Sequence, residues 1–101
     1  MRKYKITWSD GTIKEIEGNK ITIYIKNLGH EFIIHESFTY SCAYELSDKD
    51  SGLHICSLTE YMPAAGGDKR LAAKLAISDL VKTKGAEKLI MALKNAPKIG
   101  A

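Results

Sequence analysis

Cysteine, proline and long apolar runs are all scarce in this sequence. Its 101 residues include two cysteines and two prolines, too few cysteines for the disulfide framework of small secreted domains. The apolar stretches are broken by charged or hydroxyl side chains and fall well short of the roughly 20 apolar residues that cross a bilayer. A charged, alternating segment follows the basic residues 1–5, where a signal peptide would have an apolar core. We therefore expect a cytoplasmic protein with no membrane partner.

Catalytic motifs are missing as well. No glycine-rich phosphate-binding loop occurs. Ser41, Cys42, His35 and Glu36 are close in sequence, but neighbouring residues of a strand point to opposite faces of the sheet. Proximity in the chain therefore does not assemble a nucleophile with its base. We expect that the protein is not an enzyme.

The sequence does have a succession of short segments with period-two alternation, separated by turn residues. In the clearest of them, Phe38, Tyr40, Cys42, Tyr44 and Leu46 occupy every second position, a pattern typical of a strand and incompatible with a helix. Strands are predicted at residues 3–8, 12–17, 21–25, 31–35, 38–46 and 53–58, with turns at 9–11, 18–19 and 27–29 and a loop at 47–52. Because all connections are short, residues 1–60 are predicted to form an antiparallel β-meander of five to six strands.

The last third of the chain has helical character. Residues 61–67 form a linker with Pro63 and two glycines, and Asp68 is a good N-cap for a helix to about Lys84. Gly85 is a natural C-terminal stop, and a second helix is predicted at about 86–95. The alternative is one helix with a kink at Gly85. The fold class is therefore α+β, in a single domain of residues 1–101 whose helical part is 68–96.

Charge is divided unevenly along the chain. Residues 1–26 have six Lys/Arg and three Asp/Glu, residues 27–67 have one and six, and residues 68–101 have eight and three. One interpretation is a fold that compensates its own charge. The other is an acidic surface that docks on a basic protein partner. The residues of that protein-binding surface would be Glu31, Glu36, Glu45, Asp48 and Asp50.

All cysteines and histidines lie between residues 30 and 56. Zinc takes about four nitrogen or sulfur ligands, and we consider Cys42, His54, Cys56 and His35 as a zinc site. The set depends on the register of the last hairpin. An even register, such as Cys42 opposite Cys56, makes the site, or a disulfide, possible. An odd register, such as Leu46 opposite Leu53, separates the ligands. Hydrophobic matching favours the odd register.

The basic helical third allows an alternative function. Its lysines could contact phosphate as part of a small nucleic-acid-associated protein. The chain has only two arginines, which are the residues most used to read guanine. No aromatic residue follows Tyr61, so the helices by themselves offer no stacking platform for bases.

The acidic stretch HESFTYSCAYELSDKDSGLHIC, the chain length and the meander-plus-helix plan together carry a resemblance. The chain is similar in build to small proteins of phages and mobile elements, and among them to anti-CRISPR proteins that inhibit type II RNA-guided nucleases. The resemblance implies a non-enzymatic inhibitor or adaptor in a bacterial host cell, which binds a nuclease domain and blocks its use of DNA. Because no diagnostic motif carries it, it transfers no functional residue. The net charge of +3 departs from the strongly acidic DNA mimics of that group.

Overall fold

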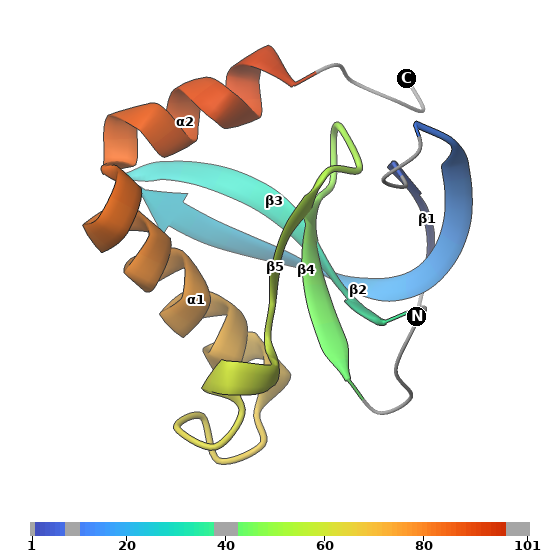
Figure 1. Cartoon of the computed structure of the whole chain (residues 1–101), viewed down its shortest axis with the longest axis horizontal. Coiled ribbons are helices and arrows are strands. Elements are labelled where there is room, and N and C mark those ends of the chain that lie inside the picture. Colours follow the sequence, from blue (N-terminus) through green and yellow to red (C-terminus); the bar gives the residue numbers. More distant parts are fainter. Residues whose placement is uncertain (1, 8–10, 38–42, 97–101) are drawn as a thin grey trace.

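The computed structural model describes residues 2–7, 11–37 and 43–96. Within them, five strands form one antiparallel sheet in sequence order, and two helices follow (Figure 1), which confirms the α+β class. The strands are β1 (Arg2–Thr7), β2 (Ile13–Ile25), β3 (Leu28–Glu36), β4 (Tyr44–Asp48) and β5 (His54–Ser57). A 3₁₀ turn η1 (Thr59–Tyr61) leads to helices α1 (Lys69–Lys84) and α2 (Ala86–Asn95).

The helices cover one side of the sheet, which we call the inner side. Ile21, Ile23 and Ile25 of β2 point to this side and are buried, as their alternation predicts. Phe32, Ile34 and Leu46 extend the same core across β3 and β4. The residues of α1 that meet them are Ala72, Ala73, Ala76 and Ile77. Three of these four are alanines, and such small side chains allow a helix to approach a sheet closely.

The opposite side of the sheet, the outer side, is partly closed because the sheet curls. Ile6 of β1, Ile16 of β2 and Ile33 of β3 form a second small apolar cluster there. The backbone N–H of Thr7 donates to the carbonyl of Gly52, 2.8 Å away, in the loop between β4 and β5. The first strand therefore touches the far end of the sheet, and the curl hides part of its outer side (Figure 1).

The predicted turn at residues 18–19 is wrong, since β2 runs through it as one strand of 13 residues. Gly18 pairs with Arg2 on one side and with His35 on the other. A Cβ at this position would lie 2.7 Å from Ile33 Cγ2 and from the Ile34 carbonyl oxygen. The glycine therefore permits a close approach of strands where the sheet curls. In the sequence, a glycine with this role looks the same as a glycine in a turn.

The next turn is also displaced from its predicted position. Lys26 and Asn27 have φ values of 50° and 65° and connect Ile25 directly to Leu28. Two residues with positive φ form the type I′ turn that suits a right-twisted hairpin. Leu28 and Gly29, predicted as turn residues, belong to β3.

The helical third agrees closely with the prediction. The carboxylate of Asp68 accepts from the N–H groups of Arg70 and Leu71, so Asp68 is the N-cap of α1. Gly85, with a φ of 88°, separates α1 from α2. There are thus two helices, and the alternative of a single kinked helix is wrong.

Candidate functional site

The five acidic residues predicted to bind a partner do not form one patch. By register, Glu31 and Glu45 point to the outer side, whereas Glu36 and Asp48 alternate to the inner side. Glu31 lies 2.9 Å from the Lys20 ammonium and 3.7 Å from that of Lys49. The hydrogen bond from Lys20 holds the pKa of Glu31 below its ordinary value. Part of the acidic charge is thus compensated inside the sheet, by lysines of β2 and of the loop after β4.

Asp48 has a structural position at the start of that loop. Its side chain is buried, and Oδ2 accepts from the Ser51 hydroxyl at 2.6 Å and from the Ser51 N–H at 3.1 Å. A carboxylate that bonds its own loop in this way stabilises the turn. Glu36 and Asp50 are exposed.

The last hairpin decides where the cysteine and histidines lie, and its register is even at one end and odd at the other. Leu46 lies opposite Cys56 and Glu45 opposite Ser57, which is an even register. Leu53, whose pairing with Leu46 favoured the odd register, is exposed before β5 begins. Leu46 is instead buried in the core under the helices.

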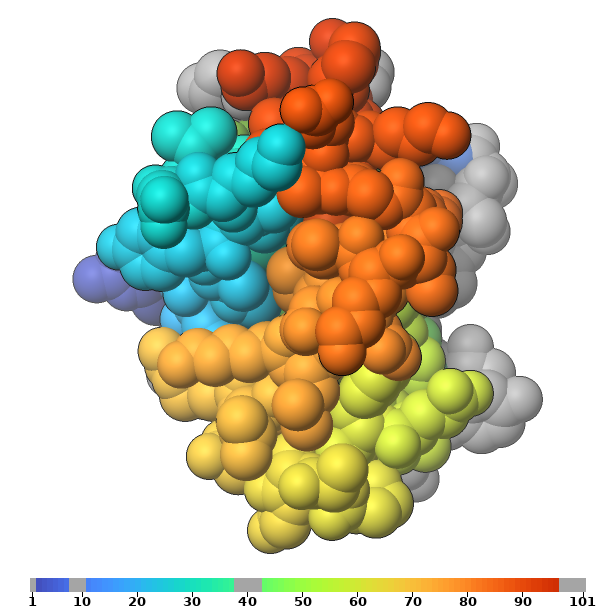
Figure 2. Space-filling model, turned by 90° about the vertical axis from the view of Figure 1, so that its left-hand side faces the viewer, coloured from blue at the N-terminus to red at the C-terminus, as the bar shows by residue number. Residues whose placement is uncertain are grey.

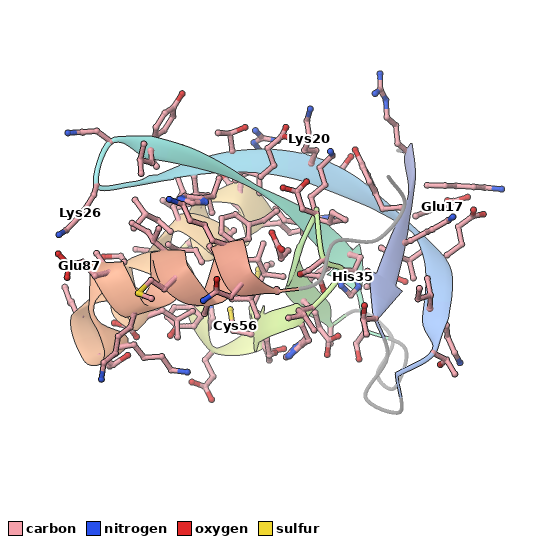
Figure 3. The ribbon with its side chains drawn as sticks, turned by 90° about the horizontal axis from the view of Figure 1, so that it is seen from above. Glu17, Lys20, Lys26, His35, Cys56 and Glu87 are labelled. Carbon is pink, nitrogen blue, oxygen red and sulfur yellow. The ribbon has the colours of Figure 1, made fainter. Side chains whose placement is uncertain are left out.

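An irregularity between Leu46 and Ser47 then shifts the pairing by one residue, so Ser47 lies opposite His54. Such a bulge changes the face to which the following side chains point. Cys56 packs against the core of the inner side, whereas His54 lies near Glu45 on the outer side. Figure 3 shows Cys56 near the helices and His35 toward β1. Burial raises the pKa of the Cys56 thiol to about 11, so this thiol is protonated at neutral pH.

His35 is buried, with both ring nitrogens engaged. Nδ1 lies 2.9 Å from the Glu36 carbonyl oxygen, to which it can only donate. Nε2 then accepts from the Ser47 hydroxyl at 2.8 Å. Because Ser47 is only 1% exposed, we assign this serine–histidine pair a structural role.

These positions bear on the zinc prediction. Among residues 2–7, 11–37 and 43–96, no group of three or more His, Cys, Asp or Glu side chains is placed to hold a metal ion. His35 would have to give up the Ser47 hydroxyl, and Cys56 lies on the other side of the sheet from His54. Cys42 lies outside the described residues. Zinc stays a prediction from sequence.

The sheet has a free edge that the sequence did not predict. Within the described residues, β1 pairs with β2 only as far as Gly18, so residues 19–25 of β2 have a neighbour on one side alone, which is β3. No other backbone hydrogen bond reaches these residues from the described part of the chain. An unpaired strand edge presents N–H and C=O groups on which another strand can pair.

The turn geometry identifies the outward-pointing groups. In a two-residue hairpin, the residues that flank the turn, here Ile25 and Leu28, exchange hydrogen bonds with each other. Along an antiparallel pair, every second residue does the same. The N–H and C=O groups of the intervening Lys20, Thr22 and Tyr24 therefore point away from β3, toward the free edge.

A groove of about 590 Å³ runs along this edge, between β2 and α1. Thr22 and Tyr24 of the outer side line it together with Ile23 and Ile25 of the inner side. A hollow lined by both faces of one strand must lie along the edge of that strand. The lining from the helical layer is Lys74, Ile77, Ser78, Val81, Lys82 and Ala86, and Lys26 completes it. Figure 2 shows the β2–β3 hairpin and α1 side by side on this face.

α1 runs beside β2 in the same direction. At one end, Asn19 shares a hollow with Lys69 and Arg70. At the other end, the Lys26 ammonium lies 3.1 Å from the carboxylate of Glu87, and the two side chains point toward one another in Figure 3. The strand from 19 to 26 is about 23 Å long, and α1 from Arg70 to Lys84 is about 21 Å long. The edge and α1 therefore flank the groove between Thr22 and Lys26, and Asn19 and Arg70 line a separate hollow.

Comparisons with known proteins identify no relative of this chain. The chain matches no protein-family model, no curated protein and no solved structure. Among the described residues, no helix is long and apolar enough to cross a membrane.

Proposed function

We propose that this chain is a non-enzymatic protein-binding module, an inhibitor or adaptor, which captures an extended segment of its partner as an added strand along the free edge of β2. The observation that carries the proposal is the unpaired backbone of residues 19–25 beside an apolar groove. In such recognition, main-chain hydrogen bonds hold the segment, and pockets for alternate side chains select it.

The energetics favour a short segment. Each backbone hydrogen bond with Lys20, Thr22 or Tyr24 contributes about 0.5–1.5 kcal/mol net. A side chain that enters the groove is removed from water against Ile23, Ile77 and Val81. Both contributions must exceed the entropy lost when the segment becomes ordered. A segment of about five residues spans the groove and uses all three outward-pointing residues.

Thr22→Pro tests the proposal directly. Proline removes the outward N–H and places its ring at the edge, but it spares the hydrogen bonds to β3, since those belong to Ile21 and Ile23. Linear peptides selected from a random display library against the wild-type chain should shift the backbone amide NMR signals of residues 20–25. We expect Thr22→Pro to weaken their binding at least about tenfold, through lost hydrogen bonds and steric exclusion.

Thr22→Val, which keeps the backbone N–H, is the matched control and should bind as the wild type does. Thermal unfolding must show that the proline variant is folded. Binding that Thr22→Pro leaves unchanged, or amide shifts confined to other strands, would contradict strand addition.

The resemblance to anti-CRISPR proteins supplies a candidate partner, a domain of a type II RNA-guided nuclease. On this proposal the chain blocks the nuclease's use of target DNA, either through the β2 edge or through the acidic residues Glu36 and Asp50. DNA cleavage by such a nuclease, measured with the wild-type chain and with Thr22→Pro, tests this partner separately. Unimpaired cleavage with an excess of wild-type chain would remove this nuclease as the partner and leave the strand-addition mode untouched.

The second candidate is nucleic-acid binding, and one observation favours it. Tyr24 is 72% exposed and lines the same groove as Lys74 and Lys82, with its ring over Gly29 of β3. We rank it second, because one ring is a small stacking platform and the groove floor is aliphatic. Steep loss of DNA affinity with rising salt, together with insensitivity to Thr22→Pro, would favour it over peptide capture.

A further inference from the structure

The side of α1 that faces the groove has a stripe of residues spaced by four. The stripe consists of Arg70, Lys74, Ser78, Lys82 and, at the start of α2, Ala86. Residues at this spacing lie on one face of a helix. Lys74, Ser78, Lys82 and Ala86 line the groove itself, and Arg70 lines the hollow that adjoins it at Asn19. The helical wall of the groove is therefore cationic.

The cations of this stripe have no carboxylate partner in the described part of the chain. The ion pairs found there use other basic residues, among them Lys20 and Lys26. No acidic residue lines the groove. In the adjoining hollow, the one carboxylate, that of Asp68, is engaged as the N-cap of α1. Positive charge at the groove is therefore available to an incoming ligand.

The spacing of the cations matches the repeat of an extended chain. Lys74 and Lys82 are eight helical residues apart, which is about 12 Å along α1. Four residues of a strand cover about 13 Å, and they return to the same face of that strand. Because α1 and β2 run side by side, a strand added to β2 would present every second side chain to α1. Residues i and i+4 would meet Lys74 and Lys82, and residue i+2 would lie over Ile77 and Val81.

We infer that the groove takes an extended acidic segment of a partner protein, with an acidic residue at positions i and i+4 and an apolar residue at i+2. This inference rests on the proposed strand addition and names the chemistry of the added strand. The lysines steer an acidic segment to the edge and fix its register, while the backbone and the aliphatic floor hold it. A second copy of this chain is a poor occupant, since edge-to-edge pairing would bring Lys20, Lys26 and the cationic stripes of both copies together.

Three peptides of seven residues test the inference by fluorescence anisotropy. The first has glutamate at positions two and six, valine at four and threonine elsewhere. The other two have glutamine or lysine in place of glutamate. We expect the wild-type chain to bind the glutamate peptide about tenfold more tightly than the lysine peptide, because two partly exposed charge pairs change from attraction to repulsion.

A double charge reversal, Lys74→Glu with Lys82→Glu, should invert this preference. The matched control is Lys84→Glu with Lys88→Glu, which changes the net charge equally at helical positions outside the groove lining. The control should keep the preference for glutamate. Amide shifts at residues 20–25 in each titration show whether a peptide occupies the edge.

Different results overturn different steps. Equal binding of the glutamate and glutamine peptides at the edge would overturn the acidic preference and leave strand addition standing. If the control variant loses the preference for the glutamate peptide as the groove variant does, net charge alone explains the effect and the inference is overturned. Occupancy of the edge by none of the three peptides would overturn the inference and weigh against strand addition too. Tighter binding of a single-stranded oligonucleotide, unaffected by Thr22→Pro, would overturn it in favour of nucleic acid.

Discussion

At the scale of single residues, His35 shows how the curl of the sheet creates a buried polar pair. The residue is 2% exposed, and its two ring nitrogens bond the Glu36 carbonyl and the Ser47 hydroxyl. Burial lowers the pKa of His35 below its ordinary value of 6.5, although the Glu36 carbonyl and nearby Glu45 act in the opposite direction. The neutral ring is thus the form that the fold accepts.

This burial predicts a loss of stability in mild acid. Above pH 6.5 the ring is neutral in both the folded and the unfolded chain, so His35 contributes no pH dependence to the free energy of unfolding there. Below pH 6.5 the unfolded chain takes up a proton that the folded chain excludes, and the free energy of unfolding falls by at most about 1.4 kcal/mol per pH unit. Urea unfolding between pH 7 and pH 5.5 measures this slope, and His35→Gln should flatten it.

The control for this experiment is His54→Gln. His54 is exposed on the outer side, and because it has the smallest of the influences on the pKa of His35, its replacement should change the slope much less than His35→Gln does. Glu31, whose pKa is lowered, contributes stability that is lost only as the pH falls below its ordinary value of 4.5, so it does not contribute in this window. A slope that persists in His35→Gln would assign the proton uptake to another group.

At the scale of elements, β2 determines the architecture. Its first half pairs with β1, and its second half forms the free edge beside α1. Gly18 stands where one half changes into the other. Because the missing side chain lets β3 approach closely at this point, the strand can curl there without ending.

Gly18→Ala should therefore destabilise the fold. The added methyl group would clash with Ile33 Cγ2 and with a backbone oxygen, both 2.7 Å from its position, and overpacking of this kind costs about 1–3 kcal/mol. Gly29→Ala is the matched control in β3. Its nearest neighbours are the ends of the Thr22 and Tyr24 side chains at 3.2 Å, which can rotate away, so the expected cost is below about 1 kcal/mol. Equal unfolding midpoints for the two variants would show that Gly18 is not under packing constraint.

At the scale of the whole molecule, two lysines stand at the ends of the free edge. Lys20 is paired with Glu31 and Lys26 with Glu87, but both remain on the edge that a second copy would have to approach. Charged residues, lysine above all, are a common protection of sheet edges against association. The same residues leave the edge open to a chain of opposite charge.

Removing this protection should allow the protein to pair with itself. We expect Lys20→Thr with Lys26→Asn to form a concentration-dependent dimer in sedimentation velocity, since asparagine keeps the positive φ of the turn. Adding Thr22→Pro to this variant should restore the monomer. Lys84→Thr with Lys88→Asn removes the same charge from the helices and should stay monomeric. A dimer that tolerates Thr22→Pro would have to use another surface.

Much of the fold follows from local signals. The isoleucines of β2, the Asp68 cap and Gly85 each determine the structure of a few neighbouring residues, and each was predictable for that reason. Gly18 was misread because a glycine that permits a close approach and a glycine that makes a turn look the same in a sequence. The predicted pairing of Leu46 with Leu53 was wrong because a shift in the ladder between Leu46 and Ser47 places Cys56 opposite Leu46, and no local pattern indicates such a shift.

The sequence by itself determined the α+β class, the helices, the buried face of β2 and the spacing of the cations at residues 70, 74 and 82, because all of these repeat with the period of one element. Only the tertiary structure decided that β1 ends its pairing at Gly18, that the edge beyond it faces α1, and that Cys56 and His54 lie on opposite sides of the sheet. The physical reason is that free edges and shared grooves are properties of pairing between distant segments, and burial of a common core, not any local pattern, sets that pairing.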